Sequence, residues 1–339
     1  MKLYAGIDLH STNSFIGVVD DNGKRLFGKR VPNREEKILL VLDRFKKDLA
    51  GIVVESTYNW YWLVDALQAE GYRVHLANPA GNVQYSGLKY TDDETDAYWL
   101  GDLKRLGILK EGYIYPKELR PTRDLLRRRL MFVRQRTAHI LSLQSLMTRQ
   151  LSLKLTGSEI KRLGEGELRT LFGDGDYFTL AKCNIRTIRY LDQVVGDIEA
   201  TVKEKVKLHP NFERTATIPG IGNILGLTTV LEIGEIERFS KAGNYSSYCR
   251  SVASKRTSNG KRKGTGNRKN GSRYLAWAYV EAANFAIRYC REAQRFYQRK
   301  KSKTNNTVAL KASGNKLARA TYHIVRYRVP FDAEKLFCR

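Results

Sequence analysis

The sequence has 339 residues and a formal charge of +25 at pH 7, and its four cysteines are widely scattered. It holds no apolar run near the roughly 20 residues that span a bilayer, its N-terminal run lacks the form of a secretory signal, and its cysteines form neither a zinc pattern nor a disulfide framework. We therefore expect a reduced cytoplasmic protein of two or three domains that has no membrane partner.

The first hundred residues alternate short apolar runs with amphipathic ones. An Asn22-Gly23 pair, which suits a tight hairpin turn, separates the second and third of these runs. Three strands in a meander, followed by helix, strand, helix and strand, predict a mixed α/β sheet resembling the ribonuclease-H type, in a domain of residues 1–110. The predicted elements are strands at 3–9, 14–19, 25–31, 51–55 and 72–77, and helices from Pro32-Asn33 to about Leu49 and at 60–70.

Four carboxylates follow the last of these strands within five positions and begin a further helix: Asp92, Asp93, Glu94 and Asp96. Such a cluster is either a solvated helix start that complements the helix dipole or a place prepared for a cation. Because Asp93 and Asp96 are three residues apart, they lie on one face of the helix.

Two more carboxylates lie at strand ends of the predicted sheet. Asp8 lies near the end of the first strand and Glu55 ends the fourth, so both would converge with Asp93 and Asp96 above the sheet. Oxygen ligands of this kind suit Mg²⁺ or Mn²⁺, and two such ions about 4 Å apart would assist phosphoryl transfer. Each acid taken alone also has a structural explanation, although a charge at Asp8 within an apolar strand needs a partner.

Two long amphipathic helices are predicted in a second region, residues 111–210. Apolar residues recur at helical spacing from Leu126 to Leu151 and again from Ile185 to Val206. With the Gly-rich connection 156–175 between them, they predict an antiparallel hairpin that packs as a coiled coil. The pattern suits an ordinary helical core as well as a dimerisation arm. Three basic residues of the first helix are candidate nucleic-acid contacts: Arg127, Arg128 and Arg129.

The positive charge is concentrated after residue 100. Residues 1–100 hold 12 Lys and Arg against 14 Asp and Glu, whereas residues 101–339 hold 48 against 21. A surplus of this size indicates a polyanionic partner, and nucleic acid is favoured. An anionic membrane surface is less well supported, because the basic residues come with Gly, Asn and Tyr rather than on one amphipathic helix.

The third region, residues 211–339, is predicted to be mainly helical. Its Pro219-Gly220-Ile221-Gly222 run fits the turn of a helix-hairpin-helix, whose exposed amides at Gly220 and Gly222 would hold a phosphate, although Gly-rich helix turns are common. No acidic residue occurs between Glu237 and Glu281. The candidate nucleic-acid contacts in this basic tract are Lys255, Arg256, Lys261, Arg262, Lys263, Arg268, Lys269 and Arg273.

The basic tract also contains hydroxyl side chains at Ser254, Thr257 and Ser258. A serine flanked by cations and glycines could attack a phosphodiester, because the surrounding charges would stabilise the transition state. More often such a serine hydrogen-bonds a phosphate. No nearby histidine supplies a base. The residues alone therefore favour a serine that binds a phosphate over a serine that acts as the nucleophile.

The ordered combination of these motifs resembles the DEDD transposases of the insertion-sequence 110 family over nearly the whole chain. The motifs that carry the resemblance are Gly6-Ile7-Asp8, Val54-Glu55-Ser56, Asp93-Glu94-Thr95-Asp96-Ala97, Ile218-Pro219-Gly220-Ile221-Gly222, Glu232-Ile233-Gly234-Glu235-Ile236, Ser258-Asn259-Gly260-Lys261-Arg262, Gly271-Ser272-Arg273-Tyr274-Leu275 and Glu281-Ala282-Ala283.

The resemblance implies a RuvC-like N-terminal domain, a coiled-coil linker and a C-terminal transposase domain. It further implies that Asp8, Glu55, Asp93 and Asp96 bind Mg²⁺ and that Ser258 forms a transient 5′-phosphoserine link to DNA. The partners it implies are donor and target DNA, a structured guide (bridge) RNA, and copies of the same chain, as a homodimer that assembles to a homotetramer. A nucleoid-associated cytoplasmic location follows from these partners.

The chain departs from the family pattern at two places. Asn259 follows the serine where the family commonly has Gly, and Ser254 is a second hydroxyl close by. The Lys expected before the acidic pair is displaced to position 89, which makes Asp92 a rival to Asp93; the Asp93-x-x-Asp96-Ala97 spacing favours Asp93.

Three functions are therefore compared. The first is a transposase or recombinase that moves an insertion sequence through a Mg-assisted serine–DNA intermediate. The second is a metal-dependent RuvC-like nuclease or resolvase that uses water as the nucleophile. The third is a non-catalytic nucleic-acid binder whose acids only begin a helix. The sequence favours the first.

Overall fold

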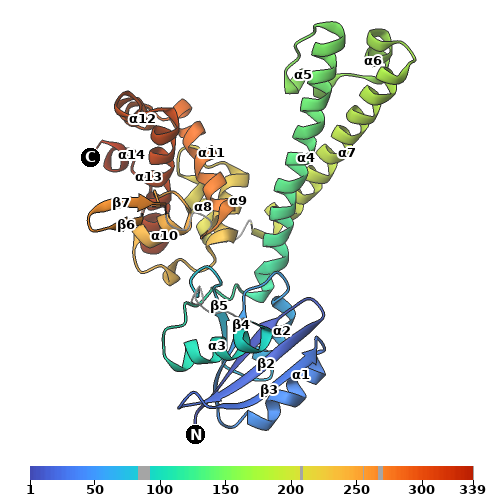
Figure 1. Ribbon diagram of the computed structural model, residues 1–339. Coiled ribbons are helices and arrows are strands. Elements are labelled where there is room, and N and C mark those ends of the chain that lie inside the picture. The colour runs from blue at the N-terminus through green and yellow to red at the C-terminus, as the bar shows by residue number, and fades with distance from the viewer. Residues whose placement is uncertain (83–91, 207–208, 255, 266–269, 339) are drawn as a thin grey trace. The chain divides into compact units, whose positions relative to one another are not determined.

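The computed structural model describes residues 1–82, 92–206, 209–254, 256–265 and 270–338. The chain divides into two units, Met1–Lys117 and Glu118–Arg339. The first holds a mixed α/β sheet and the second is mainly helical (Figure 1), which confirms the predicted fold class at this level. The RuvC-like relationship, the coiled coil, the helix-hairpin-helix and the three-region division at residues 110 and 210 remain predictions. Among the described residues, no helix is both long enough and apolar enough to cross a membrane.

A five-stranded sheet forms the centre of the first unit (Figure 1). Its strands lie in the order β3-β2-β1-β4-β5; β2 is antiparallel to both of its neighbours, and β4 is parallel to both of its own. This meander followed by parallel crossovers is compatible with the predicted ribonuclease-H type. The strands are β1 (Leu3–Leu9), β2 (Asn13–Asp20), β3 (Arg25–Pro32), β4 (Leu49–Glu55) and β5 (Val74–Ala77).

Different helices cover the two faces of this sheet. Ile7 of β1 is buried with residues of α1 (Glu35–Leu42) and α2 (Tyr61–Ala69). Gly6, the preceding residue, faces α3 (Asp93–Arg105) on the opposite side. Because side chains alternate along a strand, Asp8 belongs to the α3 face as Gly6 does. The fold thus directs Asp8 towards the helix that carries Asp93 and Asp96.

The first predicted helix is shorter than expected. It begins at Glu35, and α1 ends at Leu42; a single 3-10 turn, η1, covers Asp43–Phe45. Leu49, predicted as its last apolar residue, begins β4 and pairs with Leu3 of β1. The apolar residues keep helical spacing to position 49, but pairing with β1 holds the backbone there in an extended conformation. The predicted end of this helix was therefore wrong.

A row of three glycines lets α3 approach the sheet closely. Gly6, Gly17 and Gly28 are paired in register across β1, β2 and β3. A Cβ atom added at Gly6 would overlap the carbonyl oxygen of Ala97, and one added at Gly17 or Gly28 would collide with the ring of Tyr98. The helix backbone therefore rests on a surface that has no side chains, which brings its acidic first turn down to the level of the sheet.

Replacing Gly6 by Ala should lower the free energy of unfolding by about 1–3 kcal/mol, as overpacking of a close contact does. The new methyl group meets backbone atoms of Ala97 and Gly101, so α3 itself must shift. Gly112→Ala is the matched control in the same unit, because its Cβ would make ordinary contacts with Leu76. Chemical denaturation of both variants measures the effect; equal losses would contradict the close-approach explanation.

The second unit begins with a helical hairpin. The long helices α4 (Arg120–Leu151) and α7 (Asp176–Val206) run side by side (Figure 1). The apolar residues predicted to form their seam, such as Met147 and Ile185, are buried in it. The predicted Gly-rich connection contains two short helices, α5 (Gly157–Arg162) and α6 (Glu165–Phe172), of which α5 begins with a capping box at Thr156.

The rest of the second unit packs short helices around α11 and α13. Its buried centre includes Tyr245, Tyr279 and Tyr322, and the hydroxyl groups of the first two lie 2.6 Å apart. A two-stranded hairpin, which the sequence analysis did not predict, projects from this helical unit. The elements are α8 (Pro210–Ala216), α9 (Asn223–Ile233), η3 (Ile236–Arg238), α10 (Ala242–Tyr248), β6 (Arg256–Ser258), β7 (Lys261–Gly264), α11 (Arg273–Tyr289), α12 (Arg291–Lys303), α13 (Asn306–Tyr327) and α14 (Ala333–Phe337).

Candidate active site

The acidic site is built on the row of residues next to the glycines. Asp8, Phe15 and Arg30 are paired in register across β1, β2 and β3, one row beyond Gly6, Gly17 and Gly28. Two residues farther along a strand lie on the same face, so Asp8 and Arg30 both lie on the face that α3 covers. The sheet register therefore places one buried carboxylate and one guanidinium beside the first turn of α3.

Asp8 and Asp93 meet around the side chain of His10. The His10 Nε2 atom lies 3.1 Å from Asp8 Oδ2 and 3.0 Å from Asp93 Oδ1. Arg30 completes the contact, with its guanidinium 2.6 Å from Asp93 Oδ2. Asp8 is only 4% exposed, whereas the other three side chains are partly open to solvent. The cluster thus has a buried inner acid and a more accessible outer one.

Glu55 and Asp96 contribute charge to the same place. Glu55 ends β4, one position beyond the last residue paired with β1, and Asp96 lies one helical turn after Asp93. Burial, opposed by His10 and reinforced by Glu55, Asp96 and Asp93, raises the pKa of Asp8 to about 6. Burial and then Asp96 also raise the pKa of Glu55. All four predicted acids therefore influence one another, although only Asp8 and Asp93 share a direct contact with His10.

Asp93 has the opposite electrostatic character. The hydrogen bonds from Arg30 and then from His10 lower the pKa of Asp93, while the hydrogen bond to Asp93 raises the pKa of His10. The outer acid is therefore held in its charged form, and the inner acid is held closer to neutral. Two carboxylates with different affinities for protons therefore lie within reach of a single bound cation.

Sequence reasoning missed His10 and Arg30. His10 follows the last residue of β1 and lies two residues after Asp8. Strand alternation therefore predicts that both side chains lie on the same face, and this was the available signal. Its position is fixed through its backbone, because the side-chain amides of Asn33 and Asn59 donate to the His10 carbonyl oxygen at 2.9 and 2.8 Å. Two segments far from His10 in the sequence therefore hold the turn that carries it.

The residues present fit a divalent cation. Ligand atoms of Asp8, His10 and Asp93 all lie within 4.8 Å of one another. His10 Nε2 carries at most one proton, and within the described chain the buried Asp8 Oδ2 atom has no hydrogen-bond donor. A buried carboxylate oxygen without a donor is costly unless a cation binds it. The donor set, rich in carboxylate oxygen, suits a hard metal ion.

The two other acids of the predicted cluster have different roles. The Asp92 side chain caps α3 by accepting a hydrogen bond from the Thr95 backbone amide at 2.8 Å. Hydrogen bonds with the Thr95 side chain and then with its backbone lower the pKa of Asp92. Glu94 is exposed on the first turn. The geometry therefore brings Asp93, rather than Asp92, to Asp8.

Ser258 lies on the exposed hairpin of the second unit. It is the last residue of β6 and pairs with Lys261, the first residue of β7. The two residues between them, Asn259 and Gly260, have positive φ values of 47° and 70°, which is the backbone of a type I′ turn. Asn is one of the few residues that adopts this conformation readily, so Asn259 is compatible with a tight turn directly after the serine.

The base of this hairpin is fixed to the helical core by backbone contacts. Arg250 Nε donates to the Gly271 carbonyl oxygen at 2.9 Å, and the Ser272 amide donates to the Tyr248 carbonyl oxygen at 2.8 Å. Gly271 has a φ of 92° and passes so close to Tyr248 that a Cβ atom would overlap its carbonyl oxygen. The two chain ends that lead into and out of the hairpin are thus held together.

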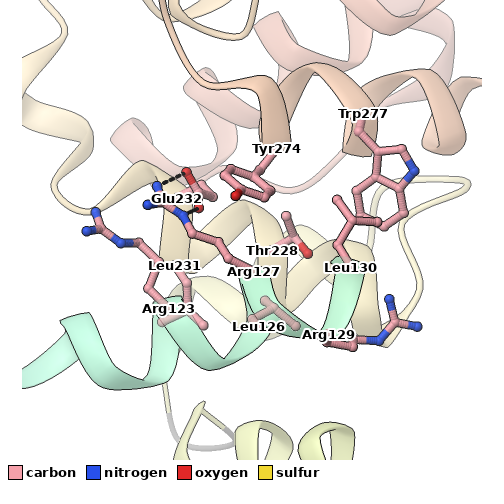
Figure 2. A pocket seen from close by; sticks show the side chains of 10 residues that line it. All are labelled: Arg123, Leu126, Arg127, Arg129, Leu130, Thr228, Leu231, Glu232, Tyr274 and Trp277. Atoms are coloured by element: carbon pink, nitrogen blue, oxygen red, sulfur yellow. Dashed lines mark hydrogen bonds and ion pairs between the residues drawn. The ribbon is translucent and has the colours of Figure 1, made fainter. Parts of the chain in front are cut away.

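An ion pair between α4 and α9 (Figure 2) is connected to this base through Ser272. The Arg127 guanidinium of α4 contacts both carboxylate oxygens of Glu232 on α9, at 2.5 and 2.9 Å, and the ring of Tyr274 lies 4.7 Å from the guanidinium carbon. Ser272, which caps α11, donates to Glu232 Oε2 at 3.0 Å. Burial opposes the charged form of Arg127, but the hydrogen bonds to Glu232 hold the pKa of Arg127 above its usual value. The network links α4, α9 and the start of α11.

Two family models match this chain. A model described as a transposase, of the DEDD type of IS110, matches residues 5–151, and a model described as the transposase IS116/IS110/IS902 family matches residues 213–298. Both models describe transposases of the IS110 type, and they match two separate regions of this chain. The transposase for insertion sequence element IS1111A of Coxiella burnetii (strain RSA 493 / Nine Mile phase I) is 26% identical over 98 residues, which cover 29% of this chain and 27% of that protein. The chain thus spans about a quarter of the length of this curated relative.

The IS110-family regions contain all the predicted catalytic residues. Asp8, Glu55, Asp93 and Asp96 fall in the first matched region, and Ser258 falls in the second. The DEDD type implies dependence on a divalent metal, and the cluster around Asp8 is a candidate for its site.

The predicted nucleic-acid contacts lie in varied surroundings. Arg127 is held by Glu232, Arg129 pairs with Glu199, and Arg128 is exposed. Gly220 is packed against Ala282 of α11, whereas a Cβ at Gly222, the cap of α9, would meet open space. Exposed side chains occur at Arg256, Lys261, Lys263 and Arg273, while Lys255, Arg268, Lys269 and the side chain of Arg262 lie outside the described part of the chain.

Proposed function

We propose that this chain is a DNA transposase that moves an insertion sequence by cutting and rejoining DNA. One observation carries the proposal: the buried carboxylate of Asp8, with an oxygen that has no hydrogen-bond donor among the described residues, faces Asp93 within a region that matches the DEDD transposases of IS110. The surplus of basic residues after position 100 supports a nucleic-acid substrate.

In this proposal Asp8, Glu55, Asp93 and Asp96 hold Mg²⁺ or Mn²⁺. A bound cation of this kind stabilises the negative charge that develops on the phosphate during phosphoryl transfer. Asp93 is already charged, because Arg30 and His10 lower its pKa. His10 and Arg30 supply the positive charge that faces Asp93, and we expect both side chains to yield part of these contacts to a cation.

Ser258 is proposed as the nucleophile. Its Oγ atom would bond to the phosphorus of the scissile phosphodiester while the bond from phosphorus to the 3′-oxygen breaks. The serine hydroxyl loses its proton, the leaving 3′-oxygen gains one, and the 5′ end stays linked as a phosphoserine ester. Reversal of the step by a 3′-hydroxyl rejoins DNA without ATP. The exposed Arg256 and Lys261 flank Ser258 and would stabilise the phosphate charge.

Further partners are proposed on the resemblance described above. A structured guide RNA would select donor and target DNA by base pairing, as in other guided enzymes. The active complex would be a homodimer that assembles to a homotetramer and acts in the nucleoid. The acids and Ser258 belong to different units of the chain, so both must reach the same phosphate during the reaction.

The Ser258→Ala variant should lose the covalent protein–DNA adduct down to background. The wild-type protein is incubated with Mg²⁺, a guide transcript and a plasmid that carries the gene with its flanking DNA, and the adduct is detected after denaturation. Ser254→Ala is the matched control, since Ser254 is the nearby hydroxyl, and should form the adduct normally. A full adduct in Ser258→Ala would refute the assignment of the nucleophile.

A nuclease that uses water is the second candidate. It is supported by the fact that all four acids lie within residues 1–117, in a unit that does not contain Ser258. This function predicts cleaved DNA with free ends and no adduct, and Ser258→Ala would then retain cleavage. The adduct experiment therefore distinguishes the two candidates.

A further inference from the structure

One helix of the second unit carries a regular row of cations. Arg291, Arg295, Arg299 and Lys303 follow one another at intervals of four residues along α12, and all four are exposed. Four residues advance a helix by about 6 Å and return to nearly the same face. The four side chains therefore form one row along the helix, which we call the α12 row.

The opposite face of α12 is fixed to the protein. Ala293 is fully buried, and the ring of Phe296 lies 5.8 Å from that of Phe337 on α14. The helix packs against α13 and α14, as its place among these helices in Figure 1 shows. Because its apolar face is already covered, α12 presents the α12 row outwards in a single orientation.

The α12 row has four cations and a single acid beside it. Glu292, the only acid of α12, interacts with Arg295 and Arg291. Between residues 233 and 339 the sequence holds 25 Lys and Arg against six Asp and Glu. The cations of α4 to α7, by contrast, pair with acids repeatedly. Like charges four residues apart destabilise a helix, so the row is unfavourable for folding alone.

We propose that the α12 row binds the phosphate backbone of duplex DNA. The proposal rests on the transposase function above and names a surface of the chain for its DNA partner. The polar residues beside the row, Gln294, Gln298 and Ser302, are exposed and uncharged. Long cations and small polar groups contact phosphates without reading bases. The contact is therefore independent of DNA sequence and holds the duplex on this face of the second unit.

Two other partners fit this surface less well. The apolar side chains of α12 pack against α13 and α14, so none is available to enter a bilayer as a membrane-bound amphipathic helix requires. Single-stranded RNA is recognised largely by stacking of bases on aromatic rings, and neither the α12 row nor the polar positions beside it include an aromatic residue. The preference for nucleic acid over a membrane surface is therefore kept for α12 in this proposal.

The test compares two pairs of arginine substitutions in the full-length protein. Arg291→Gln with Arg295→Gln removes two members of the α12 row. Arg169→Gln with Arg186→Gln removes two equally long cations that are 62% exposed but paired with Asp174 and Glu165. Binding of a fluorescent duplex of unrelated sequence is measured between 50 and 200 mM NaCl, a range in which phosphate contacts give a strong salt dependence.

The Arg291→Gln/Arg295→Gln variant should make the negative slope of log affinity against log salt shallower by about 1.8, since each lost phosphate contact contributes about 0.9. The control pair should leave the slope unchanged. Without DNA, the α12 variant should unfold at about the same temperature as the wild type, because the two removed charges are exposed and their loss removes both repulsion within the row and attraction to Glu292. Arg291→Lys with Arg295→Lys should retain the wild-type slope.

Three results would overturn the proposal: an unchanged slope in the α12 pair, an equal change in the control pair, or a change seen only with an RNA ligand. Its failure is separable from that of the transposase function. A wild-type protein that forms no serine adduct but shows the expected slopes refutes the chemistry and leaves the DNA surface standing. A wild-type protein that forms the serine adduct, together with an α12 pair that leaves the slope unchanged, refutes the DNA surface alone.

Discussion

Replacing Asp8 by Asn should lower the rate of DNA cleavage more than about a hundredfold, while making the metal-free protein harder to unfold. Residues that only support a metal ligand already contribute about 10–100-fold when removed, and Asp8 is proposed as a direct ligand. The amide keeps the size of the side chain but removes a charge that is 4% exposed and lies near three other acids. The same substitution therefore acts in opposite directions on activity and on stability.

The gain in stability should depend on pH. Because burial raises the pKa of Asp8 to about 6, the native protein binds more protons than the unfolded chain between about pH 4 and pH 6. The wild type accordingly loses stability as the pH rises through this interval, whereas Asp8→Asn does not. Thermal unfolding in a chelating buffer should show a clear gain at pH 7 that nearly vanishes at pH 4. Added Mg²⁺ should stabilise the wild type and leave the variant unchanged.

Asp92→Asn is the control for this experiment. Asn and Asp cap helices about equally well, so the cap at the start of α3 should survive and cleavage should continue at the wild-type rate. A loss of activity in Asp92→Asn as large as in Asp8→Asn would show that Asp92, rather than Asp93, is the ligand. A stability of Asp8→Asn that is lower than wild type at pH 7 would contradict the unsatisfied buried charge.

Replacing Glu232 by Ala should lower the free energy of unfolding by about 3 kcal/mol, the lower end of the range for breaking a buried ion pair. Glu232 is 3% exposed and accepts hydrogen bonds from both Arg127 and Ser272. Its removal leaves the Arg127 charge without a partner and the cap of α11 without an acceptor. The lower end applies because the Arg127 side chain is still 30% exposed to solvent.

Two comparisons make this prediction specific. Asp174→Ala breaks an exposed pair with Arg169, whose side chain is 62% exposed, and should reduce stability by only about 0.2–1 kcal/mol. Arg127→Met combined with Glu232→Leu should restore most of the loss, because apolar replacements for a buried pair are often neutral. Guanidinium denaturation of the single and double variants measures the coupling. If Glu232→Ala were no more destabilising than Asp174→Ala, the ion pair would not stabilise the base of the hairpin.

The hairpin that carries Ser258 shows where a local signal was present but incomplete. An Asn-Gly pair predicted the turn at Asn22-Gly23, and the structure places a tight turn there, with Gly23 at a φ of 81°. The same dipeptide at Asn259-Gly260 forms the turn between β6 and β7. It was not recognised because its flanking residues are mostly cations, which lack the apolar alternation that marks a strand buried on one face.

The sequence by itself determined the strands of the sheet, the common face of Asp93 and Asp96, and the basic character of the region after residue 100. These properties depend on spacing and composition within a few residues. Only the tertiary structure decided that His10 lies between Asp8 and Asp93, that Arg30 reaches Asp93, and that Arg127 pairs with Glu232 across 105 residues. Those contacts depend on strand register, on the glycine row that lets α3 approach, and on helix packing. Each of these brings together segments that are distant in the chain, and no local pattern specifies which residues will meet.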